Sequence, residues 1–190
     1  MKKTFMILSA FVLLTAFTAW TGAWNNDDAH SQLTFTVKHL GITDVTGTFN
    51  DFDVSIESKK ADFSDAVVEL TAKVASIDTR VEARDNHLKS ADFFDAEKYP
   101  DLYFKSSGIR KITPTKFQLT GPLTMHGVTK TVSVIMDYTG TVVNAMNKKQ
   151  TAGFRVTGVI KRSDFNIGNG FPAPMISDEV RIKADGEFIQ

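Results

Sequence analysis

The stretch Gln32-Leu33-Thr34-Phe35-Thr36-Val37-Lys38 alternates polar and apolar side chains one by one. Neighbouring side chains of a β-strand point to opposite faces, so this alternation predicts a strand with one apolar and one polar face. The same period of two recurs around residues 43–56, 67–74, 102–105, 117–123, 131–137, 154–161 and 180–188. We therefore expect about eight strands.

Clean alternation favours an antiparallel sheet with one face in water. Eight such strands close naturally into a barrel, which removes the exposed edges of an open sheet and can hold one small ligand. The period alone does not separate this barrel from a β-sandwich with a solid core. A transmembrane barrel is disfavoured because the strands lack flanking aromatic girdles. The predicted fold class is all-β, an eight-stranded antiparallel barrel.

One block, residues 76–100, departs from the strand pattern by its density of charged and aromatic residues. Thr79-x-x-Glu82 matches a capping box, which predicts a short helix directly after it. Pro100 disfavours helical geometry at the residue before it and restarts extended chain. We expect a short helical insertion that caps one barrel end, packing Phe93 and Phe94 over the opening.

The first residues have the features of a targeting segment. Lys2 and Lys3 precede a nearly continuous apolar run over residues 5–17, and Ala23 ends a stretch of small residues. This predicts a signal peptide over residues 1–23 and export of a single domain over residues 24–190. A retained membrane anchor is the alternative, but the run is shorter than the roughly 20 residues that span a bilayer.

Composition excludes several classes of function. The chain has no cysteine, which rules out disulfides, a thiol nucleophile and a thiolate metal site. Lys and Arg together number 22, as do Asp and Glu, so the charge does not suggest a nucleic-acid partner. The four histidines lack metal-ligand spacing, and no nucleophile elbow or phosphate loop occurs. We expect neither a metal nor an enzyme.

Several segments, in order along the chain, resemble the YceI-like family. They are Leu33-x-Phe35-x-Val37-x-His39 with its preceding Trp24, Val45-x-Gly47-x-Phe49, the block over residues 76–106, Leu123-Thr124-x-x-Gly127-Val128, and Arg162-Ser163-Asp164-Phe165. The resemblance implies a lipocalin-like, extended barrel with an apolar lumen. It implies a bacterial periplasmic or secreted protein that binds an amphiphilic lipid, notably a polyisoprenoid, and that forms a homodimer in many members.

Two positions fit the family pattern less closely. Asn166 stands where the family more commonly has glycine, and asparagine also tolerates left-handed backbone geometry. The loop over residues 168–174 carries no pattern that assigns it a role.

The resemblance turns the apolar strand face from ordinary core into a predicted ligand wall. The predicted lumen residues are Leu33, Phe35, Val37, Leu70, Phe104, Phe117, Leu119, Val134, Phe154, Val156 and Ile182. A bound lipid, an isoprenoid by the resemblance, is the expected ligand, and no cofactor is expected.

Charged residues near the predicted barrel end form a second candidate site. Arg84, Asp85 and Arg162 are candidates for contacting a lipid head group, since a guanidinium binds phosphate through two hydrogen bonds. The alternative is a structural ion-pair network that pins the helix over the barrel. Two other functions stay open: an enzyme acting on a lipid-linked phosphate through Arg84, Asp85 and His87, or a stress protein with a solid core and no ligand.

Overall fold

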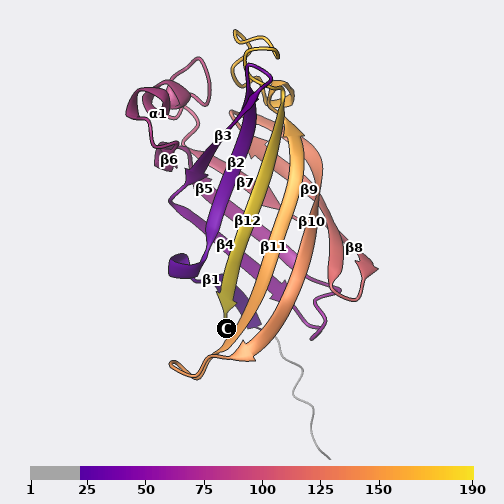
Figure 1. Ribbon diagram of the computed structural model, residues 1–190. Coiled ribbons are helices and arrows are strands. Elements are labelled where there is room, and N and C mark those ends of the chain that lie inside the picture. The colour runs from indigo at the N-terminus through magenta and orange to yellow at the C-terminus, as the bar shows by residue number, and fades with distance from the viewer. Residues whose placement is uncertain (1–21) are drawn as a thin grey trace, which may run out of the picture.

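The computed structural model describes residues 22–190 (Figure 1), so residues 1–21 of the predicted signal peptide lie outside the described residues. Twelve strands form one sheet. They are β1 (Gly22–Asn26), β2 (Gln32–His39), β3 (Thr43–Phe49), β4 (Phe52–Ser58), β5 (Val67–Lys73), β6 (Ile77–Asp78), β7 (Asp101–Lys105), β8 (Gly108–Thr113), β9 (Lys116–Met125), β10 (Val128–Val143), β11 (Gln150–Lys161) and β12 (Glu179–Ile189).

The described residues contain one α-helix and three 3-10 turns. The helix is α1 (Glu82–Lys89), and the turns are η1 (Asp28–His30), η2 (Val74–Ser76) and η3 (Arg162–Phe165). The prediction of an all-β chain with a short helical insertion is confirmed.

Eight strands close the barrel in the order β1-β4-β5-β7-β9-β10-β11-β12, and β12 pairs with β1 to complete the ring. Every pairing in the sheet is antiparallel. The predicted eight-stranded antiparallel barrel is therefore confirmed, and a sandwich is excluded. Strands β2, β3, β6 and β8 are additional to the ring.

Strand β12 changes partner along its length, and this gives the barrel two different halves. Its last residues pair with β1, whereas residues 181–185 pair with β2, which leads on to β3. The far edge of β3 is paired only at Thr48 and Phe49, with β6. Residues 79–100, which include α1, cover this side of the barrel in place of a further strand (Figure 1). We call this half the mouth half.

The opposite, floor half is closed by the loop between β4 and β5, which brings Phe63 under the barrel. The Phe63 ring lies 5.6 Å from Trp24, 5.0 Å from Tyr138 and 4.8 Å from Phe154 (centroid distances), and its side chain is buried. These large rings, with Phe117 and further apolar residues, fill the floor half as a continuous core.

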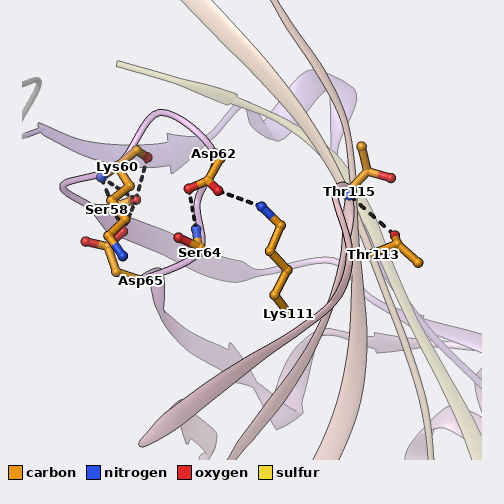
Figure 2. A network of polar contacts seen from close by, with 8 residues as sticks. All are labelled: Ser58, Lys60, Asp62, Ser64, Asp65, Lys111, Thr113 and Thr115. Carbon is orange, nitrogen blue, oxygen red and sulfur yellow. Dashed lines mark hydrogen bonds and ion pairs between the residues drawn. The ribbon is translucent and has the colours of Figure 1, made fainter.

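Polar contacts hold the Phe63 loop in place (Figure 2). The Asp65 carboxylate accepts from the Ser58 hydroxyl at 2.6 Å and from the backbone N–H of Lys60 at 3.2 Å. The Asp62 carboxylate accepts from Lys111 Nζ of β8 at 2.6 Å, which ties the loop to the neighbouring strand. The hydrogen bonds from Lys111 and Ser64 hold the pKa of Asp62 well below its usual range.

Candidate functional site

The mouth half contains an apolar cavity of about 360 Å³. Strands supply most of its wall through inward-facing aliphatic and aromatic side chains. These are Leu33, Phe35, Val37, Val45, Phe49, Leu70, Leu102, Leu123, Met125, Ile160, Val180 and Ile182. A cavity of this volume lies within the usual range for small-ligand pockets, which are concave and mostly apolar.

Two covering segments complete the cavity. Residues 79–100 contribute Thr79, Arg84, His87, Leu88, Phe93 and Phe94, and the loop over residues 166–177 contributes Ile167, Phe171, Met175 and Ile176. The Phe93 and Phe171 rings stack with centroids 4.8 Å apart, and His87 contacts both rings edge-on. This aromatic contact joins the two segments above the cavity.

The predicted packing of Phe93 and Phe94 over the barrel end is confirmed. Phe93 is buried against Phe171, and Phe94 meets the Phe49 ring edge-on at a centroid distance of 6.2 Å. Both side chains face the cavity, so they form part of its wall as well as its cover.

The capping-box prediction at Thr79 is wrong. The N-cap of α1 is Val81, which makes no side-chain cap, and Arg80 between them has a left-handed φ of 66°. That turn directs Thr79 inward, where its hydroxyl donates to Asp85 and its backbone N–H donates to the same oxygen at 2.8 Å. Thr79 therefore fixes the helix through a buried carboxylate instead of capping it.

Arg84 and Asp85 meet at Thr79 and not at each other. Arg84 Nε donates to the Thr79 hydroxyl oxygen at 2.7 Å, and its Nη2 donates to the Thr79 carbonyl at 2.8 Å. Three of its five N–H groups have no hydrogen-bond partner among residues 22–190. Arg84 lines the cavity, whereas Asp85 is buried outside the lining. Only Arg84 has N–H groups left to donate to a ligand.

Arg162 is buried and uses all five N–H groups on backbone carbonyls. Nε donates to Ser177 at 3.2 Å, Nη1 to Ile167 and Gly168 at 3.0 and 2.6 Å, and Nη2 to Phe171 and to Ile176 at 3.1 Å. All five acceptors belong to the 166–177 loop. A head group at Arg162 would therefore have to displace a bond that holds the loop.

The predicted lumen residues divide between the two halves of the barrel. Leu33, Phe35, Val37, Leu70 and Ile182 line the cavity. Phe117, Leu119, Val134 and Phe154 lie in the packed floor core, and Val156 packs against that core. Phe104 is buried in the mouth-half cluster without lining the cavity.

The loop that had no pattern, residues 168–174, turns out to cover the cavity. Its signal in the sequence was Phe171, a large aromatic residue between Gly170 and Pro172 in a loop. Asn166 adopts a left-handed φ of 59°, as expected for this substitution of glycine.

One group of possible metal ligands lies on the surface of the described residues, away from the cavity. Donor atoms of Asp27, His30 and Glu187 lie within 4.8 Å of one another. The hydrogen bond between His30 and Asp27 raises the pKa of His30 and lowers that of Asp27. Asp27 also accepts from the Ala29 N–H at 3.1 Å, so its carboxylate serves as the cap of η1.

No helix within residues 22–190 has the length and apolar character needed to cross a membrane.

Known proteins match this chain over nearly all of the described residues. The sequence matches the YceI-like domain over residues 24–188. A UPF0312 protein of Staphylococcus aureus is 35% identical over 166 residues, covering 85% of this chain and 94% of the relative. The crystal structure of BcnA from Burkholderia cenocepacia superposes with a TM-score of 0.76 at 29% identity, covering 87% of this chain and 99% of BcnA.

Two further structures share the fold. The YceI protein of Campylobacter jejuni superposes with a TM-score of 0.73 at 34% identity, covering 80% of this chain and 89% of that protein. A polyisoprenoid binding domain from Saccharophagus degradans superposes with a TM-score of 0.61 at 14% identity, covering 90% of this chain and 99% of the domain. With its barrel, its covered cavity and a match over nearly all described residues, this chain belongs to the YceI-like domain family.

Proposed function

We propose that the protein binds the apolar chain of an amphiphilic lipid, a polyisoprenoid or a lipid of similar shape, in the mouth-half cavity. It sequesters or carries that lipid after export from the bacterial cell, in the periplasm or as a secreted protein. Binding, and not catalysis, is the activity. The family supports this assignment, as does the shared fold of a domain described as polyisoprenoid-binding.

The apolar cavity is the single observation that carries the proposal. The floor half shows that this sequence can pack a barrel closely, because its rings and aliphatic side chains form a continuous core and the pocket beside Phe154 and Val156 measures about 30 Å³. The mouth half instead keeps about 360 Å³ surrounded by apolar side chains. Each CH₂ group transferred from water into such a site contributes about 0.8 kcal/mol, so a prenyl or acyl chain binds tightly without polar contacts.

Arg84 gives the ligand an orientation. It is the cavity-lining cation with free N–H donors in the described residues, and His87 lies on the same helix at the same wall. A phosphate or other polar head group at Arg84 would leave the chain pointing toward Leu70 and Ile182. Arg162 and Asp85 are then structural residues, engaged by the protein itself.

Residues 79–100 form the proposed route of entry. Several backbone hydrogen bonds of this segment are internal, such as Phe94 N–H to the Leu88 carbonyl at 3.0 Å and Tyr99 N–H to the Asp95 carbonyl at 2.8 Å. The segment can therefore swing outward as a unit, whereas parting two barrel strands would break a whole ladder of hydrogen bonds.

The alternative enzyme, acting on a lipid-linked phosphate through Arg84, Asp85 and His87, is not favoured by the geometry. The Asp85 carboxylate accepts hydrogen bonds from the hydroxyl and the backbone N–H of Thr79, and Asp85 does not line the cavity. The alternative of a ligand-free protein with a solid core agrees with the packed floor half. It does not explain the cavity in the mouth half.

The test combines lipid extraction with a cavity-filling substitution. Protein purified from its own host is extracted with organic solvent and compared with the intact protein by native mass spectrometry. We expect one lipid per chain. In parallel, binding of a C20 prenol is measured for Val37→Phe, which places a ring in the cavity, and for Val159→Phe, which adds the same ring to the outer face of β11.

The Val37 variant should lose most of its prenol binding, and the Val159 variant should bind like the unaltered protein. A folded protein that carries no lipid from its host and binds no prenol would contradict the proposal. Turnover of a prenyl phosphate by the purified protein would favour the enzyme instead.

A further inference from the structure

Three large apolar side chains are exposed together at the mouth end of the barrel. Leu40 and Ile42, in the turn between β2 and β3, are 56% and 81% exposed, and Met175, in the 166–177 loop, is 43% exposed. The Leu40 N–H donates to the Met175 carbonyl at 2.9 Å, so the turn and the loop stand side by side (Figure 1). We call Leu40, Ile42 and Met175 the apolar rim.

Leu40 suits neither the backbone geometry of its turn nor its exposure to solvent. The Ile42 N–H donates to the His39 carbonyl at 3.1 Å, and both central residues have positive φ, 51° at Leu40 and 73° at Gly41. Such turns favour Asn, Asp or Gly, and a bulky residue is strained there. No burial of Leu40 offsets the strain, and an outlier of this kind points to a function.

The apolar rim is continuous with the cavity wall. Met175 belongs to both, and His39 and Ile176, which pair across a β-bridge beside the turn, also line the cavity. The rim is held firmly, because the Ser177 N–H donates to the Lys38 carbonyl at 2.8 Å and Arg162 binds the same loop from within. An apolar path through Ile176 and Met175 therefore runs from the cavity to the outside, with the exposed His39 beside it.

We propose that the apolar rim inserts into the surface of a lipid bilayer, so that the lipid passes between bilayer and cavity without crossing water. This inference rests on the proposed function. The charges nearest the turn argue that apolar contact drives the docking. Asp44 is bonded to both Lys38, at 2.9 Å, and Arg181, at 2.6 Å, so little free charge remains for anionic head groups. A neutral phosphatidylcholine bilayer should suffice.

The far end of the barrel offers a matched control. The hairpin between β10 and β11 exposes Val142 and Val143 to 65% and 62% and Met146 to 94%, but it lies beyond the packed floor, away from the cavity (Figure 1). Exposure alone would make both ends bind a bilayer, whereas continuity with the cavity selects the mouth end.

The chain has no cysteine, so a single environment-sensitive fluorophore can be attached at a chosen site. Ile42→Cys and Val143→Cys are each labelled and mixed with phosphatidylcholine vesicles that carry a membrane-embedded quencher. We expect a blue shift and strong quenching for the label at position 42 and no change at position 143. Equal quenching of both labels, or quenching of neither, would overturn the proposal.

A second variant separates docking from ligand binding. Leu40→Asn with Ile42→Ser gives the turn residues that suit its backbone, so the protein should fold at least as well. Its partitioning to vesicles should fall at least about tenfold, and it should transfer a fluorescent prenyl probe between vesicles correspondingly more slowly, with unchanged probe affinity in solution. Transfer at the original rate would refute the docking. If the unaltered protein binds vesicles but no probe, the proposed function fails and the docking stands.

Discussion

Replacing Arg162 with methionine removes the most heavily bonded side chain at the mouth end. Its five N–H groups all donate to carbonyls of the 166–177 loop. A hydrogen bond from a charged donor contributes about 1.5–3 kcal/mol, so a plain sum would exceed 7 kcal/mol. That sum is too large, because all five carbonyls belong to one loop that can open and be hydrated. We expect a loss of about 3 kcal/mol in the free energy of unfolding, typical for breaking a buried polar network.

Arg155→Met is the matched control on β11. Arg155 is half exposed and pairs with Asp185 at 2.8 Å, so its loss should cost at most about 1 kcal/mol. Urea unfolding gives the two free energies, and hydrogen exchange locates the effect. For Arg162→Met we expect faster exchange over residues 166–177, with β9 to β11 protected as before.

Two results would refute this account of Arg162. One is a loss of stability no greater than that of Arg155→Met. The other is lost prenol binding with unchanged exchange in the loop, which would make Arg162 a head-group ligand after all.

Three further predictions follow from the covering segments and the floor. Thr79→Val removes the hydroxyl that donates to Asp85 and accepts from Arg84, and leaves the buried Asp85 carboxylate with the backbone N–H of residue 79 alone. This should cost about 1–3 kcal/mol, with faster exchange over residues 81–94 and no such effect in Thr79→Ser. The Asp62 carboxyl has a lowered pKa in the folded protein. Its contribution to stability is therefore complete above its unfolded pKa, near 4, and is lost as the pH falls below that value. Lys111→Met should shift the NMR titration of Asp62 to higher pH, and an unchanged titration would contradict the pairing. Phe63→Ala should cost about 3–5 kcal/mol in thermal or urea unfolding, and a loss below 1 kcal/mol would show that the floor does not depend on this ring.

The strands could be predicted because their determinants are local, since alternation marks each strand on its own. The choice of a barrel over a sandwich rested on the resemblance to the YceI-like family, because the period of two is common to both folds. The exchange of partners along β12 could not be predicted, since it depends on which residues of β1 and β2 reach the same edge. Register between distant strands is a property of the assembled sheet and leaves no trace in any one segment.

The sequence predicted which side chains point into the barrel, but not how far along the barrel axis each one lies. Phe35 and Phe154 both follow the inward pattern, yet one lines the cavity and the other packs in the floor, because height along the barrel depends on register. At Thr79 the capping-box motif spans four residues, but the hydrogen bond that forms depends on residues outside the motif. Asp85, six residues on, bound the hydroxyl once Arg80 had turned the chain inward. The five acceptors of Arg162 are backbone carbonyls, which any sequence would have supplied.

The incomplete pairing of β3 has a consequence for the size of guest the barrel can accept. In a fully closed barrel the diameter is set by strand number and stagger, so a bulkier guest requires a different sheet. Here one side of the mouth half is supplied by residues 79–100, which carry no barrel register. Lengthening or shortening that insertion would change the width of the cavity and leave every barrel strand in place. The same barrel could thus be adapted to thicker or thinner lipids by changes in about twenty residues.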